Sequence, residues 1–103
     1  MDILEKDLEQ KLVREVKRIG GWALKFTSPG QAGVPDRILL FPGKVYFVEL
    51  KAPGHTLRPL QEQVIRRMRN LQQKVFTVSS ADELEWLIQF IKDDRYRVTQ
   101  EVL

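Results

Sequence analysis

Two carboxylates and one ammonium group stand in this sequence where a hairpin could bring them together. Asp36 opens one β-type segment, and Glu49 and Lys51 close the next, with a short turn between the two segments. If the segments pair antiparallel, Asp36 lies level with Glu49 and Lys51. Because side chains alternate along a strand, Glu49 and Lys51 share one face. The spacing therefore predicts a compact polar cluster at one end of a sheet.

A carboxylate at position 49 requires a nearby cation, because its strand is otherwise apolar and an unpaired buried charge is costly. Lys51 is one such cation, and the two residues would then form an ordinary ion pair at a strand end. A divalent metal is the other, because oxygens from Asp36, Glu49 and the Leu50 main-chain carbonyl suit Mg²⁺ and leave positions for water and phosphate. The residues alone leave both interpretations open.

The hydrophobic pattern predicts the elements that would hold this cluster. Apolar spacings of three and four predict helices over residues 3–19, 59–71 and 81–92, and β-type runs predict strands over 22–27, 37–41, 45–51 and 75–78. A loop rich in Gly and Pro, residues 28–35, precedes Asp36, and Pro42, Gly43 and Lys44 form the turn of the central hairpin. The order αβββαβα predicts an α/β fold with a small mixed sheet flanked by helices.

The C-terminal segment is harder to interpret. Residues 95–103 alternate only loosely, which leaves an edge strand, a dimer arm or a frayed end as alternatives, so the single domain is assigned to residues 1–94. Trp22 and Trp86 are expected in the core rather than at a base-stacking surface. His55 follows a Pro-Gly turn and has no partner for nucleophilic or metal chemistry, which favours a structural or surface role.

Composition narrows the function classes. The 103 residues include 17 Lys and Arg against 14 Asp and Glu, and the net charge of +3 suits a polyanionic partner without requiring one. The absence of Cys and the single His exclude a disulfide framework, a thiolate zinc site and a histidine cluster. Because the start is charged and no apolar run could cross a bilayer, we expect a cytoplasmic protein without a membrane partner.

Basic side chains recur on two of the predicted helices. They are Lys11, Arg14, Lys17 and Arg18 on the first, and Arg58, Arg66, Arg67, Arg69 and Lys74 on or beside the second. Such surfaces could hold backbone phosphates of a nucleic acid. Each residue taken singly is equally well explained as a solvated side chain paired with a neighbouring glutamate.

Three motifs follow one another in an order that resembles a nuclease family. They are G-V-P-D-R-I at residues 33–38, V-E-L-K-A-P-G at 48–54 and L-R-P-L-Q at 57–61. The first two resemble the PD-(D/E)xK nuclease signature. All three together resemble the stand-alone phage and bacterial type of the virus-type replication-repair nuclease (VRR-NUC) family, over about residues 5–90. The resemblance implies a restriction-endonuclease-like αβββαβ core.

The resemblance also implies roles for the residues of the polar cluster. Asp36 and Glu49 are expected to ligate Mg²⁺ or Mn²⁺, alongside the Leu50 carbonyl considered above. Lys51 is expected to position or activate the attacking water and to stabilise charge that grows on the phosphate. No histidine is needed for this chemistry.

Two further residues enter through the resemblance. A glutamate on the first helix is expected to complete the metal shell, and Glu9, eleven residues before Gly20, has the expected spacing, with Glu5 as the competing candidate. Gln61 lies within the apolar stripe of the second helix and is expected to support the active site. A buried amide bonded to the main chain is the alternative for Gln61.

The function expected from this resemblance is a metal-dependent endonuclease that hydrolyses DNA phosphodiester bonds. Structure-specific cleavage of branched DNA, in the manner of a four-way junction resolvase, is expected from a homodimer in a bacterial or phage-infected cell. A general or nicking nuclease and a non-catalytic DNA-binding module are the alternatives. No nucleotide cofactor is expected, because residues 28–33 do not form the G-x-x-x-x-G-K-[ST] loop.

Overall fold

The computed structural model describes the backbone of residues 4–102 and the side chains of residues 4–95. The elements are α1 (Glu5–Arg18), β1 (Trp22–Lys25), β2 (Arg37–Phe41), β3 (Lys44–Leu50), α2 (Pro59–Asn70), β4 (Val75–Val78) and α3 (Ala81–Val102). All seven predicted elements are present in the predicted order. The α/β prediction is therefore confirmed.

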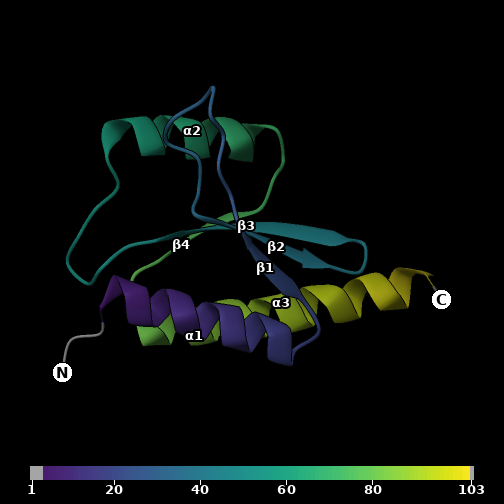
Figure 1. Ribbon diagram of the computed structural model, residues 1–103. Helices are drawn as coiled ribbons and strands as arrows, with labels where there is room; N and C mark the ends of the chain where they lie inside the picture. The colour runs from purple at the N-terminus through teal and green to yellow at the C-terminus, as the bar shows by residue number, and fades with distance from the viewer. Residues whose placement is uncertain (1–3, 103) are drawn as a thin grey trace.

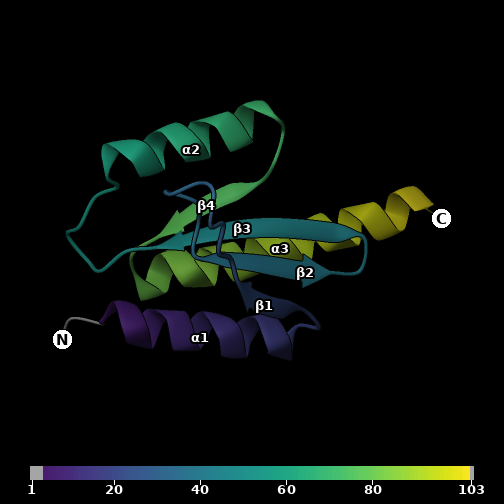
Figure 2. The ribbon, with the colours of Figure 1, turned by 45° about the horizontal axis from the view of Figure 1, so that its top comes forward.

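The strands form one mixed sheet in the order β1-β2-β3-β4, so β1 and β4 are its outermost strands. β1, β2 and β3 pair antiparallel, while β3 and β4 run parallel. Helices α1 and α3 cover one face of the sheet and α2 lies over the other (Figures 1 and 2). The result is a three-layer arrangement in which α2 connects the two parallel strands.

The main core lies between the sheet and the pair α1 and α3. The stripe predicted for the first helix is buried, with Leu8, Leu12 and Val16 fully inaccessible to solvent. Strand β3 alternates as expected: Tyr46, Val48 and Leu50 enter this core. The residues between them point to the opposite face, toward α2, and Glu49 is one of these.

Helix α3 is longer than predicted and runs through Val102 instead of ending near residue 92. The edge-strand interpretation of residues 95–103 is therefore wrong. Contacts from distant segments hold the helix there. Buried Asp94 accepts hydrogen bonds from Tyr46 Oη at 2.5 Å and Lys74 Nζ at 2.9 Å, and Arg95 donates to the carbonyl of Ile19. The dimer-arm prediction concerns side chains beyond position 95, which lie outside the described residues.

Both tryptophans are largely exposed, so the expectation that they lie in the core is wrong. Trp22 belongs to β1, the outermost strand opposite β4, whereas α2 lies beside β4 (Figure 2). Trp86 stacks on Phe90 with ring centroids 5.4 Å apart. Sequence alternation predicts which face a side chain takes, but not whether another element covers that face.

Two arginines bond to main-chain carbonyls of the outermost strands. Arg37 donates from Nη1 to the Ala23 carbonyl in β1 at 3.2 Å. Arg69 of α2 donates from Nη2 to the Val75 carbonyl in β4 at 2.7 Å. Within residues 4–102, no helix is both long and apolar enough to span a membrane.

Candidate active site

The β2–β3 hairpin brings Asp36 to the end of β3, as predicted. The register pairs Arg37 with Val48, which places the preceding residue, Asp36, level with Glu49. Asp36 Oδ2 accepts a hydrogen bond from the Leu50 main-chain N–H at 2.9 Å. Gly43 closes the hairpin with a φ of 70°, in the left-handed region that favours glycine. The turn chemistry thus fixes which residues face each other.

Glu49 is the buried carboxylate of the site, with 2% of its surface exposed. Its Oε2 accepts a hydrogen bond from Gln61 Nε2 at 2.9 Å and lies 3.4 Å from Lys51 Nζ. Its Oε1 is buried and has no hydrogen-bond partner in the described part of the chain. A buried carboxylate oxygen without a partner is costly, so an additional cation or donor would stabilise it.

The pKa of Glu49 reflects its burial and its neighbouring charges. Burial raises the pKa of Glu49 to about 7, the negative charge of Asp36 contributes in the same direction, and Lys51 opposes the shift only in part. The two carboxylates therefore repel each other inside a largely desolvated space. This charge distribution favours a cation of higher charge than the single ammonium group that is present.

Lys51 follows directly after β3, and both its main chain and its side chain have partners. Its main-chain N–H donates to the Val78 carbonyl of β4 at 3.0 Å. Its side chain is 14% exposed and its Nζ lies beside Glu49 Oε2. One strand end thus presents a carboxylate and an ammonium group on the same face, as the alternation predicts.

Gln61 connects the site to the beginning of α2. Its Oε1 accepts from the Arg58 main-chain N–H at 2.9 Å, while its Nε2 donates to Glu49. The oxygen thereby caps the helix, with Pro59 in its first turn. The two ends of this amide therefore take different partners, the main chain of Arg58 and the carboxylate of Glu49.

The structure separates the two glutamates considered on α1. Glu9 pairs with Arg37, with 3.3 Å between its Oε2 and Arg37 Nε. Glu5 is exposed, and its charge makes a small contribution to the raised pKa of Glu49. Sequence reasoning missed the Arg37 contact. The alternation that places residue 37 on the α1 side of β2 was the available signal for it.

The oxygens that could hold a metal come from Asp36, Glu49 and the Leu50 carbonyl. No group of three or more His, Cys, Asp or Glu side chains suited to a metal occurs among the described residues. The unpartnered Oε1 of Glu49 and the adjacent negative charge of Asp36 nonetheless fit a hard divalent cation, which takes carboxylate and carbonyl oxygens. The residues present therefore suit Mg²⁺ or Mn²⁺.

The basic residues divide into structural and exposed groups. Lys74 contacts Asp94 and Arg69 contacts Val75, so both have structural partners. Arg58, Arg66 and Arg67 are exposed on or beside α2, the helix that contacts Glu49. These three remain available for phosphates. His55 lies exposed in the turn after β3.

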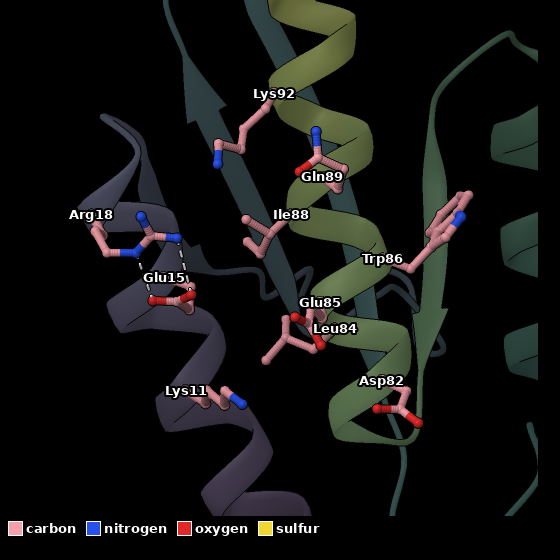
Figure 3. Close-up of a pocket in the computed structure, with 10 residues that line it drawn as sticks. All are labelled: Lys11, Glu15, Arg18, Asp82, Leu84, Glu85, Trp86, Ile88, Gln89 and Lys92. Atoms are coloured by element: carbon pink, nitrogen blue, oxygen red, sulfur yellow. Dashed lines mark hydrogen bonds and ion pairs between the residues drawn. The ribbon is translucent and has the colours of Figure 1, made fainter.

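The first helix does not present a uniformly basic surface. A cavity of about 610 Å³ lies between α1 and α3, and Figure 3 shows its lining side chains. Lys11 and Arg18 line it together with Glu15, Asp82 and Glu85, and Arg18 Nε pairs with Glu15 Oε2 at 2.9 Å. This mixed cavity lies on the face of the sheet opposite α2, away from the polar cluster.

Comparison with known proteins finds a related protein and a related structure. The chain is 47% identical over 81 residues to "Putative nuclease p44" of Acyrthosiphon pisum secondary endosymbiont phage 1, covering 78% of this chain and 87% of that protein. A solved structure described as "VRR_NUC domain" superposes with a TM-score of 0.75 and 29% identity, covering 84% of this chain and 97% of that one. No protein-family model matches the sequence.

The mixed sheet, with Asp36 opposite the Glu49-Leu50-Lys51 strand end, defines a nuclease fold of the PD-(D/E)xK superfamily. Within that superfamily, the chain belongs to the VRR-NUC family.

Proposed function

We propose that this protein is a metal-dependent DNA endonuclease with its active site at Asp36, Glu49 and Lys51. The observation that carries the proposal is the burial of Glu49 beside Asp36 with one carboxylate oxygen unpartnered. A protein that only binds DNA gains nothing from burying Glu49 beside a second carboxylate that repels it. In a metal-dependent enzyme, a bound cation offsets the free-energy cost of desolvating Glu49 and bringing the two carboxylates together.

Asp36, Glu49 and the Leu50 carbonyl would hold Mg²⁺ or Mn²⁺, with Glu9 or Glu5 of α1 as a further carboxylate. When bound, such an ion polarises the phosphodiester and lowers the pKa of a water molecule. Glu9 would first have to exchange its contact with Arg37. Glu5 already contributes charge at Glu49.

Lys51 positions the attacking water and stabilises the negative charge that grows on the phosphate. The water oxygen attacks phosphorus in line, the bond from phosphorus to the 3′ oxygen breaks, and the products carry a 5′ phosphate and a 3′ hydroxyl. The proton that the water loses passes to solvent, and the 3′ oxygen takes one from solvent. Gln61 acts as a positioning residue, because it bonds Glu49 and not the reacting atoms.

Branched DNA, such as a four-way junction, is the proposed substrate, and a homodimer is the proposed active form. A chain of 103 residues offers little surface for a large substrate. Two copies would double the phosphate contacts and supply two cuts. The exposed arginines near α2 support contact with the DNA backbone. The related phage protein supports action in the cytoplasm of a bacterial or phage-infected cell.

The test compares wild type, Asp36→Asn and the control Asp93→Asn, an exposed aspartate on α3. Each is incubated with labelled linear, flapped and four-way DNA in Mg²⁺, Mn²⁺ or EDTA. We expect metal-dependent cleavage by wild type and the control, loss of cleavage with Asp36→Asn, and a preference for the junction. DNA binding without cleavage under either metal would contradict the nuclease assignment and indicate a DNA-binding module. Equal cleavage of all substrates would indicate a general nuclease.

A further inference from the structure

An apolar groove of about 520 Å³ runs along α2 on the same side of the sheet as Glu49. Leu60, Val64, Met68 and Leu71 line its helical side, and Phe26 and Val34 line the opposite side. Leu60 is 44% exposed and Leu71 is 67% exposed. We call this feature the α2 groove. These apolar side chains line one groove together instead of lying scattered over the surface.

The loop between β1 and β2 forms a fixed wall of the α2 groove. Figure 1 shows this loop rising from the sheet to α2. At Gly33 the loop backbone has a φ of 86°, and a Cβ there would lie 3.0 Å from Leu60 Cγ and 3.2 Å from Val64 Cγ2. Only glycine allows the loop to approach the helix this closely. The glycine-rich segment therefore shapes a groove.

The groove is connected to the candidate active site through residues that are close neighbours in the chain. Val34, in one wall, is two residues before Asp36, and Leu60, in the other, is followed by Gln61, which contacts Glu49. From Leu60 to Leu71 the groove follows the whole helix, a length of about 17 Å at about 1.5 Å per residue. A DNA strand cleaved at Asp36 and Glu49 could therefore continue into it.

The chemistry of the groove suits exposed nucleobases. Its polar lining consists of the amides of Gln31 and Gln63 and the guanidinium of Arg67, with no carboxylate. Amides pair with base edges, apolar walls accept base faces, and arginine pairs with phosphate. The cavity between α1 and α3 differs, because acidic and basic side chains line it in equal number and Arg18 is already paired with Glu15.

We propose that the α2 groove binds unpaired nucleotides of the DNA strand next to the scissile phosphate. This inference rests on the proposed nuclease function and specifies how branched DNA is recognised: the groove holds bases that are unpaired where a strand leaves the branch point, which continuous duplex does not offer. The bases lie against the apolar side chains of α2, the Gln63 amide bonds a base edge, and Arg67 pairs with a phosphate. The groove would thus favour DNA in which bases are unpaired, independently of the base sequence.

Binding without cleavage tests the groove. In EDTA, fluorescence anisotropy compares labelled duplex with the same duplex carrying a short unpaired flap. Wild type is expected to bind the flapped DNA about tenfold more tightly, a difference typical of one stacked base. Gln63→Ala and Leu71→Ser should each reduce this preference several-fold and leave duplex affinity unchanged.

Matched variants elsewhere on the chain serve as controls. Gln10→Ala changes another exposed helical glutamine, and Leu4→Ser changes a leucine that is 65% exposed, close to the 67% of Leu71. Both should keep the full preference. Equal binding of flap and duplex by wild type, or an unchanged preference in both groove variants, would overturn the inference.

A parallel cleavage assay in Mg²⁺ separates this inference from the proposed function. Cleavage without a preference for flapped over duplex DNA would support the proposed nuclease function and contradict the proposed role of the groove. Preferential binding of flapped DNA without cleavage in either metal would support the proposed role of the groove and contradict the proposed nuclease function.

Discussion

Gln61 Nε2 donates a hydrogen bond to Glu49 Oε2 at 2.9 Å, and the same amide caps helix α2 through its oxygen. One side chain therefore fixes both the start of a helix and the orientation of a buried carboxylate. Any movement of the first turn of α2 changes the position of that carboxylate.

The first prediction concerns this amide. Gln61→Ala should lower kcat by about 10- to 100-fold, as removal of a group that orients a metal ligand does, while KM for DNA stays within a few-fold. Loss of the cap should also cost about 1 kcal/mol in the free energy of unfolding. Single-turnover kinetics and urea denaturation measure the two effects, with Gln10→Ala as the control. A change confined to KM would assign Gln61 to DNA contact instead.

Glu49→Gln should make the metal-free protein more stable while it abolishes cleavage. The substitution removes a desolvated charge and its repulsion with Asp36, and it keeps the side-chain shape. We expect a gain of about 1–3 kcal/mol in the free energy of unfolding at pH 8, because a pKa raised to about 7 means that the folded state disfavours the ionised carboxylate at that pH. Urea denaturation in EDTA provides the measurement. A destabilised Glu49→Gln would mean that the Lys51 ion pair outweighs the desolvation.

Divalent metal should stabilise the wild type and not the ligand variants. At a concentration 100 times the dissociation constant, binding to the folded state alone adds about 2.7 kcal/mol. Melting curves with Mg²⁺, and again after EDTA is added, should show a reversible rise in Tm for wild type and for Asp93→Asn. Asp36→Asn should show little change. A similar rise in Asp36→Asn would place the metal elsewhere.

Asp94 should make stability fall in acid. Burial alone would raise its pKa, but hydrogen bonds from Tyr46, Lys74 and Lys44 outweigh this and lower the pKa of Asp94 to about 2. Because the folded-state value lies below the unfolded value, the stabilisation is present above about pH 4 and is lost as pH falls toward 2. Asp94→Asn should cost about 2 kcal/mol at pH 7.

That difference between wild type and Asp94→Asn should shrink by pH 2.5. Urea denaturation across this range measures it, and Asp93→Asn, one residue away and exposed, should show no such dependence. A constant difference at all pH values would rule out the charge of Asp94 as its cause.

Two glycines of one loop should differ in how much substitution by alanine changes the stability of the protein. Gly33→Ala meets both a φ of 86° and close contact with Leu60, so it should destabilise the protein by about 1–2 kcal/mol. At Gly30 a Cβ would meet nothing within 4 Å, so Gly30→Ala should be neutral or slightly stabilising. Thermal melts compare the two. Equal effects would contradict the packing of the loop against α2.

Local chemistry explains what could be predicted from the sequence. The turn at Gly43 and strand alternation together fix that Asp36 faces Glu49, and apolar spacing fixes the buried side of α1. The features that were missed depend on residues far apart in the chain. Arg37 and Glu9 are 28 positions apart, and Asp94 holds α3 in place through Tyr46, 48 positions away. Alternation gives the face on which Arg37 lies, but local patterns do not say which distant residue it meets there, or which faces remain uncovered, as at Trp22.

The arginine contacts of the outermost strands limit how two copies could associate. The carbonyls of Lys74, just before β4, and of Val78, at its end, accept hydrogen bonds from the β3 side. The Val75 carbonyl between them therefore points outward, where it accepts from Arg69. Arg37 holds the Ala23 carbonyl of β1 in the same way. Extending the sheet from one copy into another would require breaking these bonds. In the proposed homodimer, the copies are therefore expected to meet through helices or an open sheet face, and strand-by-strand polymerisation is disfavoured at both ends of the sheet.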